Sequence, residues 1–320
     1  MLADSLRTDQ PAFRQARLGD PLLVQLREFS RMQEELKAER IALGNRLREH
    51  LHRYFPQVLA IGSVYDARWL WELLELAPTP ELAKKLSLSK LRAVLKTHRI
   101  RALTAEHVKE QLTARALYVA PGVTEATSRR VTLLIQRLRL AHDQKLQIER
   151  DIETALDELC EAGADKPPSD ARLLRSMPGL GTLVCATLLA EAWEPIEARD
   201  YGRLRIVCGV APVTKRSGKQ YSVGMRSGCS GRLRTAIHYW IGNAIQRDAH
   251  WKAHYAALRA AGHSHGRAER GVGDRFDRNA GGCTEVAYAV CCRPPTVYRQ
   301  VPACSPKFLN VAGCAGGLNA

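Results

Sequence analysis

The chain has 320 residues, of which 45% are hydrophobic, and this length predicts two or three structural units with substantial cores. Its formal net charge of +15 at pH 7 favours a polyanionic partner, nucleic acid in the first place, because basic side chains neutralise phosphates and release their counterions. The sequence shows neither a run of about 18 apolar residues nor a signal-peptide core, which argues against a membrane protein and predicts a cytoplasmic one.

Two long segments have the apolar spacing of amphipathic helices. Residues 20–56 repeat leucine at helical intervals among charged residues, and Phe55-Pro56 ends the pattern. Residues 124–160 carry two aliphatic heptad positions, interrupted by Lys145: Val131, Leu138, Ile152 and Leu159 in one, Leu134, Ala141, Ile148 and Ala155 in the other. The pattern leaves two arrangements equally open, because the helices can pair within one chain or form a coiled coil in a homo-oligomer.

The remaining elements also read as mostly helical. Residues 66–120 carry helical patterning and predict a helical insertion, whereas the glycines and prolines of 161–170 predict a linker. A turn with Pro178-Gly179 follows, and the stretches 203–209 and around Ser217-Gly218 look irregular or briefly extended, before a helix over 232–258. The predicted fold is mainly α: long coiled-coil-like helices, then a helical C-terminal domain containing a helix-hairpin-helix-like Pro-Gly turn.

The composition changes beyond Phe276. The last forty residues contain five of the nine cysteines and a single acid, Glu285, and helical periodicity ends. This favours an altered reading frame or disorder over an accessory domain. The cysteines lack Cys-x-x-Cys spacing, and His263 and His265 lack a third ligand nearby, so we assign no metal-binding residue.

Residues 199–234 form a strongly basic segment. They contain nine lysines and arginines and one acid, Asp200. Such a run is often only a solvated surface, but beside a Pro-Gly turn it predicts contacts with a phosphate backbone, to which glycines offer open N–H groups at a helix start. The predicted nucleic-acid-binding residues are Gly179, Gly181, Lys215, Arg216, Lys219, Arg226, Arg232 and Arg234.

Ser217 lies inside this segment, between Arg216 and Gly218. A serine hydroxyl becomes a nucleophile only when a base takes its proton and the phosphate charge is neutralised. Lys215, Arg216 and Lys219 could meet the second requirement, but the base or metal must come from elsewhere. From the residues alone, a serine that closes a polar turn is the simpler interpretation.

The order of these elements resembles the C-terminal domain of one bacterial transposase family, the insertion-sequence one-ten and one-sixteen transposases. The resemblance runs from the Pro-Gly turn through Pro212, Ser217-Gly218 and Leu233-Arg234 to residues 262–268. Each element alone is a weak signal, but their shared order and spacing argue against chance. The resemblance implies RNA-guided, serine-dependent DNA strand exchange, that is, transposition by DNA recombination.

By the same resemblance, Ser217 is the nucleophile that joins covalently to DNA. A cluster of acids in an N-terminal RuvC-type domain would bind the Mg²⁺ that assists it. Because residues 1–10 resemble the end of that domain, we expect an N-terminally truncated chain without Mg²⁺ ligands of its own. The expected partners are DNA, a guide (bridge) RNA and further copies of the chain, in the bacterial cytoplasm at the nucleoid.

The expected domains are 1–10, the remnant of the nuclease domain; 11–165, the helical and coiled-coil region with its insertion; 166–276, the serine transposase domain; and 277–320, an aberrant tail. Whether this chain is an enzyme stays open. The first hypothesis is a transposase that is incomplete in this chain. The alternative is a non-catalytic nucleic-acid-binding or regulatory protein, and a third possibility is a decayed copy without a stable product.

Overall fold

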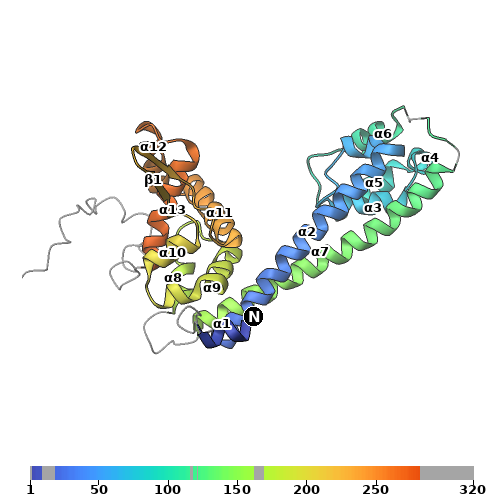
Figure 1. Ribbon diagram of the computed structural model, residues 1–320. Helices are drawn as coiled ribbons and strands as arrows, with labels where there is room; N and C mark the ends of the chain where they lie inside the picture. The colour runs from blue at the N-terminus through green and yellow to red at the C-terminus, as the bar shows by residue number, and fades with distance from the viewer. Residues whose placement is uncertain (1, 9–18, 116–117, 121, 162–168, 282–320) are drawn as a thin grey trace, which may run out of the picture. The chain divides into compact units, whose positions relative to one another are not determined.

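The computed structural model describes residues 2–8, 19–115, 118–120, 122–161 and 169–281 (Figure 1). Within these ranges the chain is mainly helical, with one two-stranded sheet, and the predicted mainly α fold is confirmed. It divides into two compact units: unit 1 comprises residues 1–171 and 181–193, and unit 2 comprises 172–180 and 194–320. None of the described helices has the length and apolarity that crossing a membrane requires.

Unit 1 is built on two long antiparallel helices, α2 (Pro21–Tyr54) and α7 (Val123–Glu161), which lie side by side (Figure 1). Asp20 caps α2 by accepting a hydrogen bond from the Leu22 amide at 2.8 Å. Their buried positions repeat at the predicted helical spacing: Leu26, Leu43, Leu47 and Leu51 on α2, and Val131, Leu134, Leu138, Ala141, Ile152 and Ala155 on α7. The two predicted helices therefore pair with each other within one chain.

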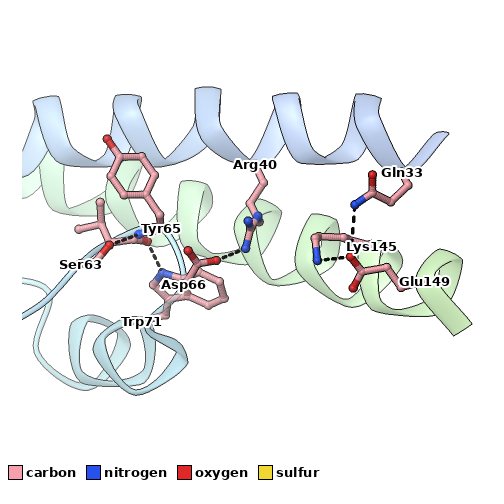
Figure 2. A network of polar contacts seen from close by, with 9 residues as sticks. Gln33, Arg40, Ser63, Tyr65, Asp66, Trp71, Lys145 and Glu149 are labelled. Carbon is pink, nitrogen blue, oxygen red and sulfur yellow. Dashed lines mark hydrogen bonds and ion pairs between the residues drawn. The ribbon is translucent and has the colours of Figure 1, made fainter. Parts of the chain in front are cut away.

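Lys145, the interruption in the heptad pattern, is accommodated by polar contacts between the helices. Its Nζ lies 2.6 Å from Oε1 of Glu149 one turn later, and Gln33 of α2 donates to the same oxygen at 3.2 Å (Figure 2). The Lys145 and Glu149 side chains are only 16% and 26% exposed. Charge-assisted hydrogen bonds offset part of the desolvation cost, and a paired polar group at a seam favours one register of the two helices.

A cluster of short helices lies where α2 ends and α7 begins, in the segment for which helical patterning was predicted (Figure 1). It consists of the 3₁₀ helix η2 (Pro56–Ala60), α3 (Arg68–Leu76), α4 (Pro80–Lys85), α5 (Leu88–Thr97) and α6 (Ala105–Thr113). Thr79, Ser87 and Thr104 cap the last three helices through their side chains. Trp71 is fully buried among them, and its Nε1 donates to the Val64 carbonyl at 2.7 Å (Figure 2).

The first part of α9 (Thr182–Glu197) also belongs to unit 1, where Arg27 Nε of α2 donates to the Ala190 carbonyl at 2.9 Å. The helix is interrupted at Ala192, whose φ and ψ are −127° and 21°. Pro195 follows three residues later and removes a backbone donor. The two units divide directly after this interruption.

Unit 2 surrounds the buried Trp240. It contains most of α8 (Asp170–Arg175), then α10 (Tyr201–Val207), β1 (Val213–Ser217), β2 (Gln220–Gly224), α11 (Gly231–Arg247), α12 (Ala249–Ala260) and α13 (His265–Gly281). Helices α11, α12 and α13 contact one another, and α10 contacts α13. Residues 282–320, most of the predicted aberrant tail, lie outside the described residues.

Three local predictions in unit 2 were wrong. Residues 203–209 do not form an irregular stretch, because α10 occupies most of them, capped by an Asp200 side chain that accepts from the Arg203 amide at 2.8 Å. The single helix predicted over 232–258 is divided at Asp248, whose carboxylate caps α12 through the amides of residues 250 and 251. Helical structure also continues beyond Phe276, to Gly281.

Candidate nucleic-acid interface

The basic segment is displayed on a β-hairpin. Strands β1 and β2 pair antiparallel from Val213 opposite Gly224 to Ser217 opposite Gln220, which leaves Gly218 and Lys219 as the loop. Gly218 has a φ of +56°, whereas φ at Lys219 is not positive, as a type II′ turn requires. The glycine that follows the serine is therefore the residue that allows the chain to reverse here.

The register divides the cations of the hairpin between two faces, because side chains alternate along a strand and cross-strand partners share a face. Lys215 pairs with Ser222 on the face that carries Ser217. Arg216 pairs with Tyr221 on the opposite face. Lys215 is therefore the strand cation positioned to neutralise charge beside Ser217, and Arg216 with Tyr221 forms a separate cation and aromatic pair.

The hairpin is almost completely exposed. Only Val213 is partly covered, and Tyr221 is 67% exposed. Within the described part of the chain, no hydrogen bond or ion pair engages the side chains of Lys215, Arg216 or Lys219. A two-stranded ribbon with no core behind it is marginally stable by itself, so unpaired cations and an exposed tyrosine on it favour a role in binding over a role in packing.

Ser217 lies at the end of β1, next to the loop. None of the described residues forms a hydrogen bond with its hydroxyl, so these residues supply no general base. Lys215 and Lys219 flank the serine along the chain. The arrangement can hold a phosphate near the hydroxyl but cannot by itself remove the hydroxyl proton.

The Pro-Gly turn has a different environment. Gly179 has a φ of +76°, and a Cβ at this position would lie 2.9 Å from the backbone N and Cα of Ala244 in α11. Trp240 Nε1 donates to the Pro178 carbonyl at 2.9 Å. Gly179 is thus required for the close approach of this turn to α11. Gly181 is exposed at the start of α9 with open space around it, which leaves room for the predicted phosphate contact.

Of the three predicted arginines beyond the hairpin, Arg226 lies in the loop after β2, and Arg232 and Arg234 lie in the first turn of α11. Arg234 donates through its guanidinium to the Arg226 carbonyl, and Ser230 caps the helix by accepting from the Leu233 amide at 3.3 Å. All three arginines are half-buried. Arg234 therefore holds the loop after β2 in place, whatever its contribution to phosphate binding.

A cavity of about 360 Å³ lies beside this loop. Its lining includes Met225, Arg234, His238, Glu269 and Arg270. The Glu269 side chain is only 15% exposed, and one of its oxygens lies 3.8 Å from Nδ1 of His238. Sequence reasoning missed this cluster, because its members come from the loop, α11 and α13 and are joined only by tertiary packing.

One of the two histidines in residues 262–266 also contacts Glu269 of this cavity. His265 lies 3.4 Å from Glu269 through Nε2 and 2.8 Å from the Tyr255 hydroxyl through Nδ1. His263 contributes only its backbone, whose carbonyl accepts from Arg259 at 2.7 Å. Across the described ranges, no group of three or more His, Cys, Asp or Glu side chains is arranged to bind a metal ion.

Comparisons of the sequence with known proteins identify a family to which this domain is similar. Residues 171–256, which include the Pro-Gly turn and the hairpin, match the model described as "Transposase IS116/IS110/IS902 family". The chain is 31% identical over 284 residues to the mini-circle putative transposase for IS117 of Streptomyces coelicolor, an alignment that covers 86% of this chain and 66% of the relative. It is 39% identical over 129 residues to the putative transposase y4uE of Sinorhizobium fredii, covering 40% and 34%.

A third relative, the uncharacterized 43.6 kDa protein of insertion element IS110 from Streptomyces coelicolor, is 25% identical over 272 residues, which cover 84% of this chain and 64% of the relative. The chain thus spans at most 66% of the length of each of these three proteins. The matches extend over both units and agree with the resemblance read from the Pro-Gly turn and the Ser-Gly motif. The chain belongs to the IS116/IS110/IS902 family of insertion-sequence transposases.

Proposed function

We propose that this chain binds DNA through the β1–β2 hairpin and takes part in DNA strand exchange through a covalent link to Ser217. The observation that carries the proposal is the exposed hairpin, on which Ser217 stands beside a type II′ loop with Lys215 on its own face and Lys219 in the loop. Membership of a transposase family supports the reaction class.

In the proposed reaction, the Ser217 oxygen forms a bond to a DNA phosphorus while the bond from that phosphorus to a sugar oxygen breaks. The hydroxyl proton goes to a base, and the departing sugar oxygen takes up a proton. A sugar hydroxyl of the second strand then attacks the phosphoserine, which releases Ser217 and completes the exchange. Lys215 and Lys219 stabilise the negative charge of the phosphoryl group in both steps.

The base and any metal belong to residues beyond this hairpin. The described residues do not fit a Mg²⁺ site, because no carboxylate lies on the hairpin and no metal-binding group occurs among them. We propose that Mg²⁺, where the reaction uses it, is bound by the acids of a RuvC-type domain supplied from outside this chain. The resemblance also supports a guide RNA as partner. A homo-oligomer would have to use helix faces outside the α2–α7 seam, which is filled within the chain.

The test is a search on a denaturing gel for a covalent adduct between labelled DNA and the full chain, with Mg²⁺ and a separately supplied RuvC-type acidic domain present, because the described residues provide no metal site. Ser217→Ala should abolish the adduct. Ser222→Ala is the matched control, since Ser222 is an equally exposed hydroxyl on the same face of the hairpin. An adduct that survives in Ser217→Ala, or disappears equally in Ser222→Ala, would contradict the proposed role of Ser217.

The second function, non-catalytic nucleic-acid binding, is favoured because no described residue forms a hydrogen bond with the Ser217 hydroxyl and could act as its base. It predicts salt-dependent DNA binding that Ser217→Ala leaves unchanged, with no adduct in any variant. Under both functions, the double variant Lys215→Ala and Arg216→Ala should bind DNA with a shallower dependence of log affinity on log salt concentration. The slope should fall in magnitude by roughly 2, because about two phosphate contacts are lost.

A further inference from the structure

A second basic surface lies in unit 1, between residues of α2 and α7 and outside the family match at 171–256. It is a cavity of about 510 Å³ whose lining includes Arg46 and His50 of α2 and Arg130, Leu133, Arg137 and Leu140 of α7. We call it the arginine groove. No motif in the sequence marks it, because its residues come from two helices that are far apart along the chain.

The arginines of the groove are mostly not neutralised. Arg46 and Arg130 are exposed, and neither makes a hydrogen bond or ion pair within the described part of the chain. Arg137 lies 3.9 Å from a Glu39 oxygen, and both side chains are at least half exposed, so this contact is weak. Three guanidinium groups around one cavity create a positive potential that a phosphate would neutralise.

His50 is a polar group inside this groove whose bonding is incomplete. The residue is only 7% exposed, and its Nδ1 is buried without a hydrogen-bond partner among the described residues. Burial, followed by the charge of Arg130, lowers the pKa of His50 and so favours the neutral ring. A neutral imidazole adds no positive charge to the groove and can donate or accept a hydrogen bond through whichever ring nitrogen a ligand reaches.

The groove also has an apolar part. Leu133 and Leu140, two turns apart on α7, are 50% and 60% exposed, whereas Leu134 and Leu138 of the same helix are buried. Nucleobases stack on apolar and guanidinium surfaces when they are not held in a duplex, whereas a duplex presents mainly phosphates. Cations beside exposed leucines therefore suit a ligand with both phosphates and unstacked bases.

We propose that the arginine groove binds a single-stranded segment of nucleic acid, with phosphates at Arg46 and Arg130 and a base over Leu133 and Leu140. This site goes beyond the hairpin of the proposed function and lies in the other unit. A symmetric contact with a second copy is disfavoured, because a twofold axis would place the three arginines of one copy opposite the same three arginines of the other, and these like charges repel.

The first experiment measures binding of the full chain to a short single-stranded RNA, the same sequence as DNA, and a DNA duplex. The double variant Arg46→Ala and Arg130→Ala should lose roughly tenfold in affinity for single strands and leave duplex binding within about twofold. The control, Lys84→Ala with Lys85→Ala, removes the same charge from exposed positions of α4 and should change single-strand affinity little. Comparing the RNA and DNA probes shows which nucleic acid the groove prefers.

Equal losses in the groove variant and the control, or equal losses for duplex and single strand, would overturn the proposal. A second variant, Leu133→Ser with Leu140→Ser, tests the apolar part at exposed positions that the fold does not need buried. It should weaken single-strand binding without changing the salt slope. If it instead dissociates an oligomer in sedimentation and leaves nucleic-acid binding intact, the groove is a self-association surface. Loss of groove binding with an intact Ser217 adduct would separate this site from the hairpin.

Discussion

Replacing Gly179 by alanine should destabilise unit 2 through two separate terms. A left-handed φ of +76° costs an alanine about 1–2 kcal/mol. The new Cβ would also lie 2.9 Å from backbone atoms of Ala244, which cannot move without shifting α11, and such overpacking typically costs about 1–3 kcal/mol. We expect a total loss of about 2–5 kcal/mol.

Gly262→Ala is the matched control. Gly262 has a similar φ of +84°, but no atom lies within 4 Å of its hypothetical Cβ, so only the conformational term applies. Both substitutions lower the entropy of the unfolded chain by the same amount, and this term cancels in the comparison. The difference of about 1–3 kcal/mol isolates the contact with α11.

The assay is urea unfolding of the full chain, monitored peptide by peptide through amide hydrogen exchange and mass spectrometry. Peptides from α11 report on unit 2 separately from unit 1, which avoids treating a chain of two units as one transition. If Gly179→Ala is no more destabilising than Gly262→Ala, the close approach is not what Gly179 provides. Unchanged stability with weakened DNA binding would instead favour the predicted phosphate contact.

Three further predictions concern stability. Trp240→Phe removes the 2.9 Å hydrogen bond to the Pro178 carbonyl and should lower the free energy of unfolding of unit 2 by about 1–2 kcal/mol. Faster amide hydrogen exchange in α11 would report this loss. Lys109 Nζ donates to three carbonyls at the end of α4, at 2.7 to 3.2 Å, and Lys109→Met leaves them without this donor. The free energy of unfolding measured in urea should fall by about 1.5–3 kcal/mol. The control Lys96→Met, at an exposed position, should leave it unchanged. Burial, followed by neighbouring arginines, lowers the pKa of His142 below 6.5, so the unfolded state takes up its proton first and unit 1 should lose stability as pH falls through this value. His142→Gln should flatten that dependence in a urea series at several pH values, and an unchanged profile would contradict the assignment.

Local features of the sequence were sufficient for several elements. The long helices were predictable because apolar residues at three-to-four and seven-residue spacing share one face of a helix, and α2 and α7 begin and end within a few residues of the predicted bounds. The position of Ser217 beside a turn followed from Gly218, which can adopt a positive φ. The short α10 was missed because only Leu204 of its seven residues is buried, which leaves too few apolar positions for a recognisable period.

The sequence by itself determined that the chain is mainly helical and basic and that it carries a Pro-Gly and a Ser-Gly motif, because these properties reside in local spacing and charge. Tertiary structure decided which surface each long helix buries, since an apolar seam is the same whether its partner is in the same chain or another. It also decided that Gly179 meets Ala244, that Lys215 and Arg216 face opposite ways, and that Arg46, His50 and Arg130 border one groove. Contacts between distant segments depend on how the helices pack, and residue spacing along the chain carries no direct record of that packing.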